Sequence, residues 1–367
     1  MKVMVTGANG FLGRHVVAAL RRRGHQVRAL VRPASNLDGL GWGDEVEIVL
    51  ADLRGPVDSL IGAFEGVDVL VHLAAAITGG EDAQFAAAVV GTERLLGAMA
   101  RSETRKLVVA SSYSVYDWSA ARGELTEDTP VEPAPDLYDR DGYAIAKVWQ
   151  ERVARRLSIE HQWSLTVLRP GFIWGLGNED LACLGQTFGR VRLVIAPLAR
   201  LPLTYVENCA DLFALAAEDP LADGQTFNVV DGDEIRTWRY LTDYLQGSGR
   251  RDWRLPVPYA LARLVVAIAQ FTSKRVFRGK GKLPSLLIPC RFEARFKPLR
   301  HSHRRATEIL GWRPLLTYRD CLKRINDSSP SSAAPNVVTT SQGHVPVPGG
   351  SNRQASVTAM TSVEPRG

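Results

Sequence analysis

The apolar positions of the first 175 residues follow two alternating patterns. Short continuous apolar runs are typical of strands buried on both faces of a parallel sheet. Between these runs, apolar residues recur every three or four positions, as in helices that pack one face on a core. The pattern predicts an α/β fold with a doubly wound parallel sheet. The predicted strands cover residues 3–5, 26–31, 47–50, 68–73, 106–110 and 164–168, and the predicted helices cover 11–20, 82–99 and 142–157.

After residue 177 the alternation weakens. A helix over 208–218, a strand over 226–230 and several later helices predict a smaller lobe that is partly interleaved with the sheet. The last stretch is rich in Ser, Thr, Pro, Gly and Val and has no aromatic residue, a composition typical of disorder. The sequence therefore predicts three parts: a dinucleotide-binding core over 1–175, a substrate-binding lobe over 176–326 and a disordered tail over 327–367.

One later segment, residues 255–271, is unusually apolar. It is shorter than the roughly 20 residues that span a bilayer, and Arg263 interrupts it. A buried helix is the expected structure. The alternative is an amphipathic helix lying on a membrane, because five basic residues follow between 274 and 282.

Charge is distributed unevenly along the chain. Residues 236–326 contain 21 basic and 5 acidic residues, whereas residues 1–235 contain 22 basic and 32 acidic ones. A basic second half favours an anionic small-molecule substrate or an anionic membrane surface. Nucleic acid is not expected as a partner, because the basic residues are not interleaved with aromatic residues that could stack on bases.

The cysteines and the N-terminus indicate the compartment. The four cysteines are far apart, so neither a disulfide framework nor a zinc site is expected, and no metal is predicted. The first predicted strand begins at once, without a basic and then apolar leader, so no signal peptide is expected. The predicted location is cytoplasmic, with membrane association as a further option.

The first candidate site is the turn after the first strand. Gly7, Gly10 and Gly13 lie between a predicted strand and a predicted helix. Glycines allow the backbone to approach a pyrophosphate closely, and the helix N-terminus offers N–H groups to it. The turn therefore predicts a dinucleotide site.

The second candidate site is formed by Ser112, Tyr143 and Lys147. Tyr143 and Lys147 are four residues apart, on one face of a predicted helix. A tyrosine has an ordinary pKa of about 10, and an adjacent cation lowers it by favouring the phenolate. Such a phenol exchanges a proton with an alcohol or a ketone while hydride moves to or from a nicotinamide. Ser112 follows a strand at the carboxyl edge of the sheet, where its hydroxyl could orient the substrate oxygen.

With these motifs the chain resembles the extended short-chain dehydrogenases/reductases, of the NAD-dependent epimerase/dehydratase type. The resemblance covers roughly residues 1–325. It includes the opening T-G-A-N-G-F-L-G and an S-S-x-x-V-Y block in which Ser112 is the catalytic serine. The matching segments are 6–13, 51–53, 71–75, 108–116, 168–175, 205–211 and 310–314.

The resemblance implies roles for individual residues. It implies a Rossmann fold, Ser112, Tyr143 and Lys147 as catalytic residues, and a homodimer formed through the helices near 82–99 and 142–157. The residues implied to hold the dinucleotide are Gly7, Asn9, Gly10, Phe11, Leu12, Gly13, Arg32, Asp52, Leu53, Leu73, Ala74, Ala75, Tyr143, Lys147, Pro170 and Ile173, and those expected to line the substrate pocket are Ile77, Thr78, Ser112, Tyr113 and Phe172.

The chain also departs from the family pattern. The acid that binds the ribose hydroxyls in NAD users is replaced by Val31, followed by Arg32, so NADP is slightly favoured over NAD. Ala88 stands where the family often has Asn, so that amide is absent or supplied elsewhere. Arg200 is displaced by one position from the arginine that contacts the diphosphate in sugar-nucleotide epimerases. Tyr113 and the following serine replace the Asp-Glu pair of dehydratases, so a 4,6-dehydratase is not expected.

Three functions remain open from the sequence. The leading one is an NAD(P)-dependent epimerase or oxidoreductase that acts on a secondary alcohol or ketone of a nucleotide-sugar. The second is a reductase or dehydrogenase similar to the 3β-hydroxysteroid dehydrogenases, with an apolar or lipid-linked substrate. The third is a non-catalytic sensor that binds a dinucleotide, which the Ser112, Tyr143 and Lys147 set disfavours.

Overall fold

The computed structural model describes residues 1–75, 81–132, 142–276 and 284–328. These residues belong to one compact unit. Of the predicted tail over 327–367, all but the first two residues lie outside the described residues. The boundary predicted at residue 175 stays a prediction.

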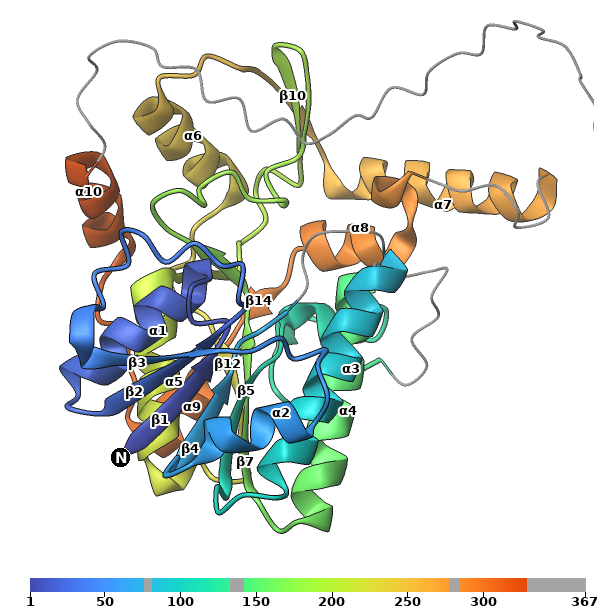
Figure 1. Cartoon of the computed structure of the whole chain (residues 1–367). Helices are drawn as coiled ribbons and strands as arrows, with labels where there is room; N and C mark the ends of the chain where they lie inside the picture. Colours follow the sequence, from blue (N-terminus) through green and yellow to red (C-terminus); the bar gives the residue numbers. More distant parts are fainter. Residues whose placement is uncertain (76–80, 133–141, 277–283, 329–367) are drawn as a thin grey trace, which may run out of the picture. The chain divides into compact units, whose positions relative to one another are not determined.

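A seven-stranded parallel sheet is the centre of the fold, in the order β12-β7-β5-β4-β1-β2-β3. The order reverses beside β1, which makes the sheet doubly wound and confirms the predicted Rossmann architecture (Figure 1). All seven strands agree with the predicted ones to within two residues at either end. The strands are β1 (Lys2–Thr6), β2 (Gln26–Val31), β3 (Val46–Leu50), β4 (Val69–His72), β5 (Lys106–Ala110), β7 (Ser164–Pro170) and β12 (Thr226–Val229).

Helices cover both faces of the sheet. Because side chains alternate along a strand, Val3 and Val5 of β1 pack on one side and Met4 on the other. The first side is covered by α1 (Phe11–Arg22) and α5 (Val206–Glu218). The second side is covered by α2 (Asp58–Ile61), α3 (Glu81–Met99) and α4 (Gly142–Glu160). This double covering explains the continuous apolar runs of the strands.

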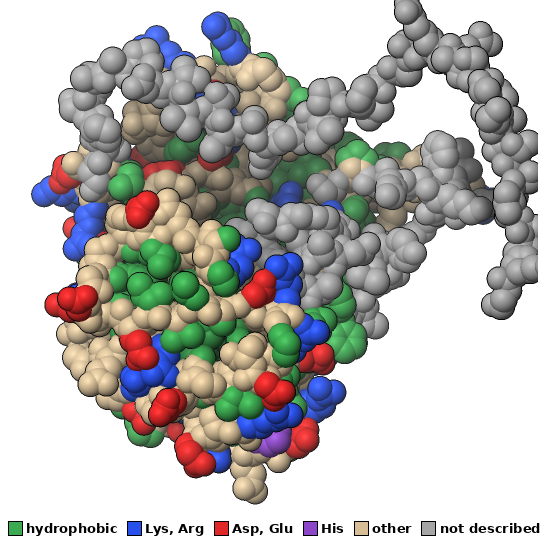
Figure 2. Space-filling view, viewed as in Figure 1, with side chains coloured by type: hydrophobic (Ala, Val, Ile, Leu, Met, Phe, Trp, Pro, Cys, Tyr) green, Lys and Arg blue, Asp and Glu red, His purple; other side chains and the backbone are tan. Residues whose placement is uncertain are grey.

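The later part of the chain, together with residues 124–125, contains short strands that the apolar pattern did not reveal. They are β8 (Phe172–Trp174) with β11 (Leu203–Tyr205), β9 (Gln186–Phe188) and β10 (Val191–Ile195) with β13 (Trp253–Val257), and β6 (Glu124–Leu125) with β14 (Arg300–His301). The helices of this part are α6 (Thr237–Ser248), α7 (Tyr259–Val276), α8 (Pro289–Phe296), α9 (Arg304–Leu310) and α10 (Tyr318–Ser328). Figure 2 shows the surface hollowed between the sheet and the region around α6, with acidic and basic side chains interspersed below.

The predicted buried helix over 255–271 is wrong in two respects. Residues 255–257 belong to β13, because Pro256 and Pro258 keep the chain extended, and the helix α7 begins at Tyr259. One side of α7 is also exposed rather than buried, as at Leu264 and Ile268. Within the described parts of the chain, no helix is long and apolar enough to cross a membrane.

Candidate active site

The glycine turn between β1 and α1 is tightly packed. Gly7 has φ +68°, and a Cβ built there would lie 2.9 Å from the amide nitrogen of Ala74. A Cβ on Gly13 would lie 2.1 Å from the carbonyl oxygen of Gly7. Glycine is therefore required at both positions. No side chain caps the N-terminus of α1, all of which is described, and its first turn has no acidic residue, so its N–H groups suit an anion.

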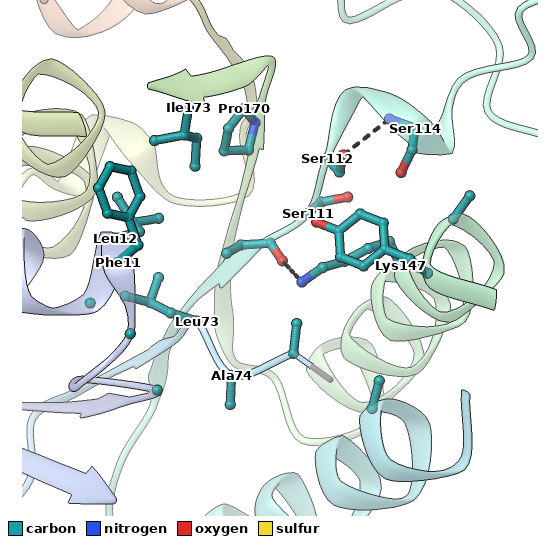
Figure 3. A pocket seen from close by; sticks show the side chains of 18 of the residues that line it. Phe11, Leu12, Leu73, Ala74, Ser111, Ser112, Ser114, Lys147, Pro170 and Ile173 are labelled. Carbon is teal, nitrogen blue, oxygen red and sulfur yellow. Dashed lines mark hydrogen bonds between the residues drawn. The ribbon is translucent and has the colours of Figure 1, made fainter. Parts of the chain in front are cut away.

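A cavity of about 1190 Å³ opens at the carboxyl ends of the sheet strands. The Ser112, Tyr143 and Lys147 set lines it, as do Tyr113 and Phe172. Ile77 and Thr78 lie outside the described residues. Each of the predicted dinucleotide residues lines the cavity, several of them visible in Figure 3: Gly7, Asn9, Gly10, Phe11, Leu12, Gly13, Arg32, Asp52, Leu53, Leu73, Ala74, Ala75, Tyr143, Lys147, Pro170 and Ile173.

Lys147 is almost fully buried beside the phenol of Tyr143. Its Nζ donates a hydrogen bond of 2.7 Å to the carbonyl oxygen of Ala110 (Figure 3) and lies 5.9 Å from the centre of the Tyr143 ring. Burial lowers the pKa of Lys147 to about 8, against the opposing effect of the Glu151 carboxylate. The lysine is thus mostly charged at neutral pH, although its pKa lies only about one unit above that pH.

Ser112 lies at the end of β5, across the cavity from α4. Its Oγ accepts a hydrogen bond of 3.1 Å from the backbone N–H of Ser114, which caps the short turn that follows (Figure 3). The cap holds the hydroxyl in place while its proton remains available to a bound molecule.

A buried ion pair anchors α4 to the sheet, and sequence reasoning missed it. Arg169 of β7 donates to both carboxylate oxygens of Glu151, at 2.9 and 2.8 Å. Burial raises the pKa of Glu151, but the hydrogen bonds from Arg169 outweigh it and hold that pKa below its ordinary value. Glu151 lies one turn after Lys147, and this spacing was the only signal in the sequence. The pair fixes the rotation of α4 and places a negative charge near Lys147.

A second buried network links β1, β4, α3 and α4. Nδ1 of His72 lies 2.7 Å from the hydroxyl of Thr6, and its Nε2 lies 3.0 Å from the hydroxyl of Thr92. Burial, with a further effect of Lys147, lowers the pKa of His72 to about 3, so the ring is neutral. Gln150 of α4 donates to the Thr92 hydroxyl at 2.8 Å. The side-chain amide of Gln150 thus reaches the turn of α3 that carries Ala88. Position 88 is where the family often has the amide of an Asn.

The end of the cavity beside β2 and β3 contains two arginines. Asp52, the predicted adenine contact, accepts hydrogen bonds from the Arg54 backbone N–H at 2.9 Å and from its guanidinium at 2.7 Å. These hydrogen bonds lower the pKa of Asp52 to about 2. Arg54 lines the cavity together with the exposed Arg32. Arg32 was predicted from the sequence as a dinucleotide-binding residue, whereas Arg54 was not.

The opposite end of the cavity is formed by α8, which sequence analysis also missed. Arg291 and Arg295 lie one turn apart on this helix, and both line the cavity with Cys290 and Ala294. The excess of basic residues in this half of the chain was the only signal for them. Arg200, in contrast, is not among the described residues that line the cavity, and its guanidinium lies 3.0 Å from the Glu234 carboxylate.

The doubly wound sheet, the glycine turn and the Ser112, Tyr143 and Lys147 set together define an enzyme of the extended short-chain dehydrogenase/reductase class. A family model described as "NAD dependent epimerase/dehydratase family" matches residues 3–248, so the chain belongs to this family.

Among curated proteins, the chain is 29% identical over 342 residues to a 3 beta-hydroxysteroid dehydrogenase/Delta 5-->4-isomerase of Mycobacterium tuberculosis, covering 88% of each chain. It is 28% identical to a 4-hydroxy-2-methyl-3-oxo-4-farnesyl-3,4-dihydroquinoline-1-oxide ketoreductase of Stigmatella aurantiaca, covering 90% of this chain and 97% of the other. A solved UDP-glucose 4-epimerase of Thermotoga maritima, with UDP-glucose, has the same fold. Its TM-score is 0.65 at 19% identity, over 89% of this chain and 98% of the other.

Proposed function

We propose that the protein is an NAD(P)-dependent oxidoreductase that interconverts a secondary alcohol and a ketone by Tyr–Lys–Ser catalysis. The observation that carries this proposal is that Ser112, Tyr143 and Lys147 line the same cavity as the glycine turn. A dinucleotide whose pyrophosphate lies at the N-terminus of α1 would extend along that cavity. The tight glycine packing and the uncapped helix support this fit.

In this mechanism Tyr143 is the general acid or base. The Lys147 ammonium favours the phenolate form of Tyr143, which takes the proton of an alcohol; in the reverse direction the phenol donates a proton to the ketone oxygen. The Ser112 hydroxyl donates a hydrogen bond to the same oxygen and orients it. When bound, the nicotinamide supplies the acceptor or donor of the hydride.

We infer a preference for NADP over NAD. Arg32 and Arg54 both line the end of the cavity where the adenosine would lie, and the acid that binds ribose hydroxyls is replaced by Val31. Two guanidiniums suit a 2′-phosphate, which accepts bidentate, charge-assisted hydrogen bonds. Asp52 is held by Arg54 and does not oppose the phosphate as an unpaired charge.

For the substrate we favour an apolar or lipid-linked alcohol or ketone that carries an anionic group. Arg291 and Arg295 on α8 supply two positive charges at the substrate end of the cavity. Phe172, Leu181 and Trp118 supply apolar surface in the same cavity. One of the curated relatives described above is named for a hydroxysteroid and the other for a farnesyl-dihydroquinoline oxide, which supports the apolar part of this proposal.

A nucleotide-sugar is the second candidate. It is favoured by the basic charge of the second half of the chain, because a diphosphate would pair with Arg291 and Arg295. It ranks lower because Arg200, the counterpart of the diphosphate-binding arginine, is paired with Glu234 away from the cavity.

The predicted homodimer and the cytoplasmic location stay predictions. The two helices expected to form the dimer, α3 and α4, pack against each other and leave Val90 and Trp149 exposed. A four-helix contact between two copies would cover these side chains.

The decisive experiment is the Tyr143→Phe variant. We expect it to bind NADP like the wild type but to lose turnover at least 100-fold, since a positioned acid or base contributes roughly 10²- to 10⁴-fold. Turnover would be followed by NADPH absorbance, as consumption with a panel of apolar ketones and as formation from NADP with a panel of nucleotide-sugars, and any epimerised sugar would be separated by chromatography. Tyr244→Phe, on α6 and outside the lining of the cavity, is the matched control.

Wild-type turnover in Tyr143→Phe would contradict the mechanism. A wild-type protein that binds neither NADP nor NAD would contradict the proposed function itself. Turnover with nucleotide-sugars alone would leave the mechanism in place and replace the favoured substrate class with the second candidate.

A further inference from the structure

The helix α7 exposes a continuous apolar stripe. The exposed positions recur every three or four residues, so they lie on one side of the helix. Scattered apolar residues are normal on protein surfaces, but a continuous stripe indicates a contact surface. The stripe consists of Leu261, Leu264, Val265, Ile268 and Phe271, which are 54%, 56%, 51%, 54% and 68% exposed.

The opposite side of α7 is already packed, so the stripe is not an unfinished part of the core. Ala262 and Val266 are buried in a cluster with Phe292 and Phe296 of α8. The rings of Tyr259 and Phe292 stack at 5.7 Å. Figure 1 shows α7 above α8, and α8 in turn lies towards the ends of the sheet strands. The stripe therefore faces away from the cavity, with α8 between the two.

A second apolar row lies on the sheet that leads into α7. Val191 of β10 pairs with Phe188 of β9 on one side and with Trp253 of β13 on the other. Residues paired in this way project from the same face of a sheet. All three are exposed, Trp253 to 76%. Tryptophan is enriched where an apolar phase meets water, because its ring is apolar and its N–H is polar.

The charges around α7 are almost all positive. Between residues 250 and 300 the sequence has thirteen basic and two acidic residues. Both acids are paired: Asp252 with Arg192 and Arg250, and Glu293 with Arg263 and Lys297. Further basic residues that are exposed include Arg251 and Arg275, at the two ends of the β13–α7 segment.

We propose that α7 lies flat on the surface of an anionic lipid bilayer, with its apolar stripe inserted among the acyl chains. An apolar stripe with flanking cations and no spanning length is the signature of an interfacial helix. A second copy of the chain is a poorer partner, because it would bring the same positive charge to the contact. Residues 327–367 are also a poor candidate for covering the apolar stripe, since they contain no Leu, Ile or aromatic residue.

This location has a consequence for substrate entry. The helix α8 contacts α7 on one side and lines the cavity on the other, through Cys290, Arg291, Ala294 and Arg295. A bilayer at α7 would therefore lie one helix away from the substrate end of the cavity. A substrate dissolved in the membrane would have a short path to Tyr143. The docking itself does not depend on the proposed reaction.

The test is co-sedimentation of the full chain with vesicles of phosphatidylcholine, with and without phosphatidylglycerol. We expect the wild type to sediment with the anionic vesicles and to bind the neutral ones at least tenfold more weakly, and we expect added salt to weaken binding. The variant Leu264→Ser/Ile268→Ser should lose at least about tenfold in vesicle binding, since each of these two half-exposed side chains contributes roughly three- to tenfold when it is withdrawn from water.

The matched control is Ile159→Ser, an equally apolar residue that is 80% exposed near the end of α4. It should bind vesicles like the wild type. NADP binding and turnover on a water-soluble ketone, measured without vesicles, should be unchanged in both variants, which separates a docking defect from a defect of the active site.

Absence of wild-type binding to anionic vesicles, or wild-type binding by the double variant, would overturn the proposal. So would light scattering that shows a dimer which the double variant dissociates, because the stripe would then be covered by a second copy.

Discussion

Replacing Lys147 with Met should make the protein more stable while it abolishes turnover. Lys147 is 3% exposed, and burial lowers its pKa from 10.5 to about 8. A base whose pKa is lower in the folded state opposes folding wherever it is protonated. The penalty is complete below about pH 8 and disappears as the pH rises towards 10.5, where the unfolded chain also loses the proton. Met has a similar length and carries no charge, so it removes the penalty.

The magnitude follows from the size of the pKa change. A shift from 10.5 to about 8 corresponds to roughly 3 kcal/mol at pH 7. The variant also loses the 2.7 Å hydrogen bond to the carbonyl oxygen of Ala110, which offsets about 1–2 kcal/mol. The net expectation for Lys147→Met is a gain of about 1–2 kcal/mol at pH 7, which corresponds to a rise in Tm of roughly 1–4 °C.

The assay is thermal unfolding of the wild type and the variant without dinucleotide, from pH 6 to about pH 10. The difference in Tm should be largest below pH 8 and should shrink above it. Tyr143→Phe is the control, because it also removes turnover but leaves the buried charge in place. A variant with a lower Tm than the wild type at pH 7, or a difference that does not change with pH, would refute the reasoning.

Two further predictions concern the charged groups around the cavity. Arg32→Ala and Arg54→Ala should each weaken NADP binding about tenfold, because these side chains are exposed and their phosphate contacts are partly screened. NAD binding should change little, and an equal loss for both dinucleotides in calorimetric titrations would contradict a 2′-phosphate site. Glu151→Gln should lower the free energy of unfolding, measured by urea denaturation, by about 3–5 kcal/mol, because it leaves Arg169 without its buried carboxylate. It should also lower the pKa of Lys147 further and move the alkaline limb of the pH–rate profile to lower pH; an unchanged limb would show that Glu151 has no influence on Lys147.

The sheet was predictable because both of its faces are buried. Strands such as β4 and β5 are built on continuous apolar runs, and the helices between the strands have a clear period. The short strands β8 to β11 were not predictable. They have three to five residues each, and two of their pairings join strands far apart in the sequence, β8 with β11 and β10 with β13. Local pattern carries no information about such pairings.

The candidate site likewise contains residues that could be predicted from the sequence and residues that could not. The predicted residues come from segments directly after strands of the sheet or from α4, so sheet topology alone brings them to one edge. Arg54, Arg291 and Arg295 could not be assigned, because a single arginine in a loop or an amphipathic helix resembles any solvated charge. The presence of Arg291 and Arg295 in the cavity depends on where α8 packs, and α8 is held by the cluster that includes Phe292 and Phe296.

The position of α8 also connects the proposed substrate end of the cavity with the proposed membrane-binding helix α7. One side of this helix is basic and lines the cavity, and the other is aromatic and packs on α7. Because the rings of Tyr259 and Phe292 stack between the two helices, we expect a shift of α7 on a surface to move Arg291 and Arg295. A small residue at Phe292 would loosen this coupling. We therefore expect vesicles to increase turnover of an apolar ketone in the wild type and to increase it less in Phe292→Ala, compared at equal amounts of bound protein.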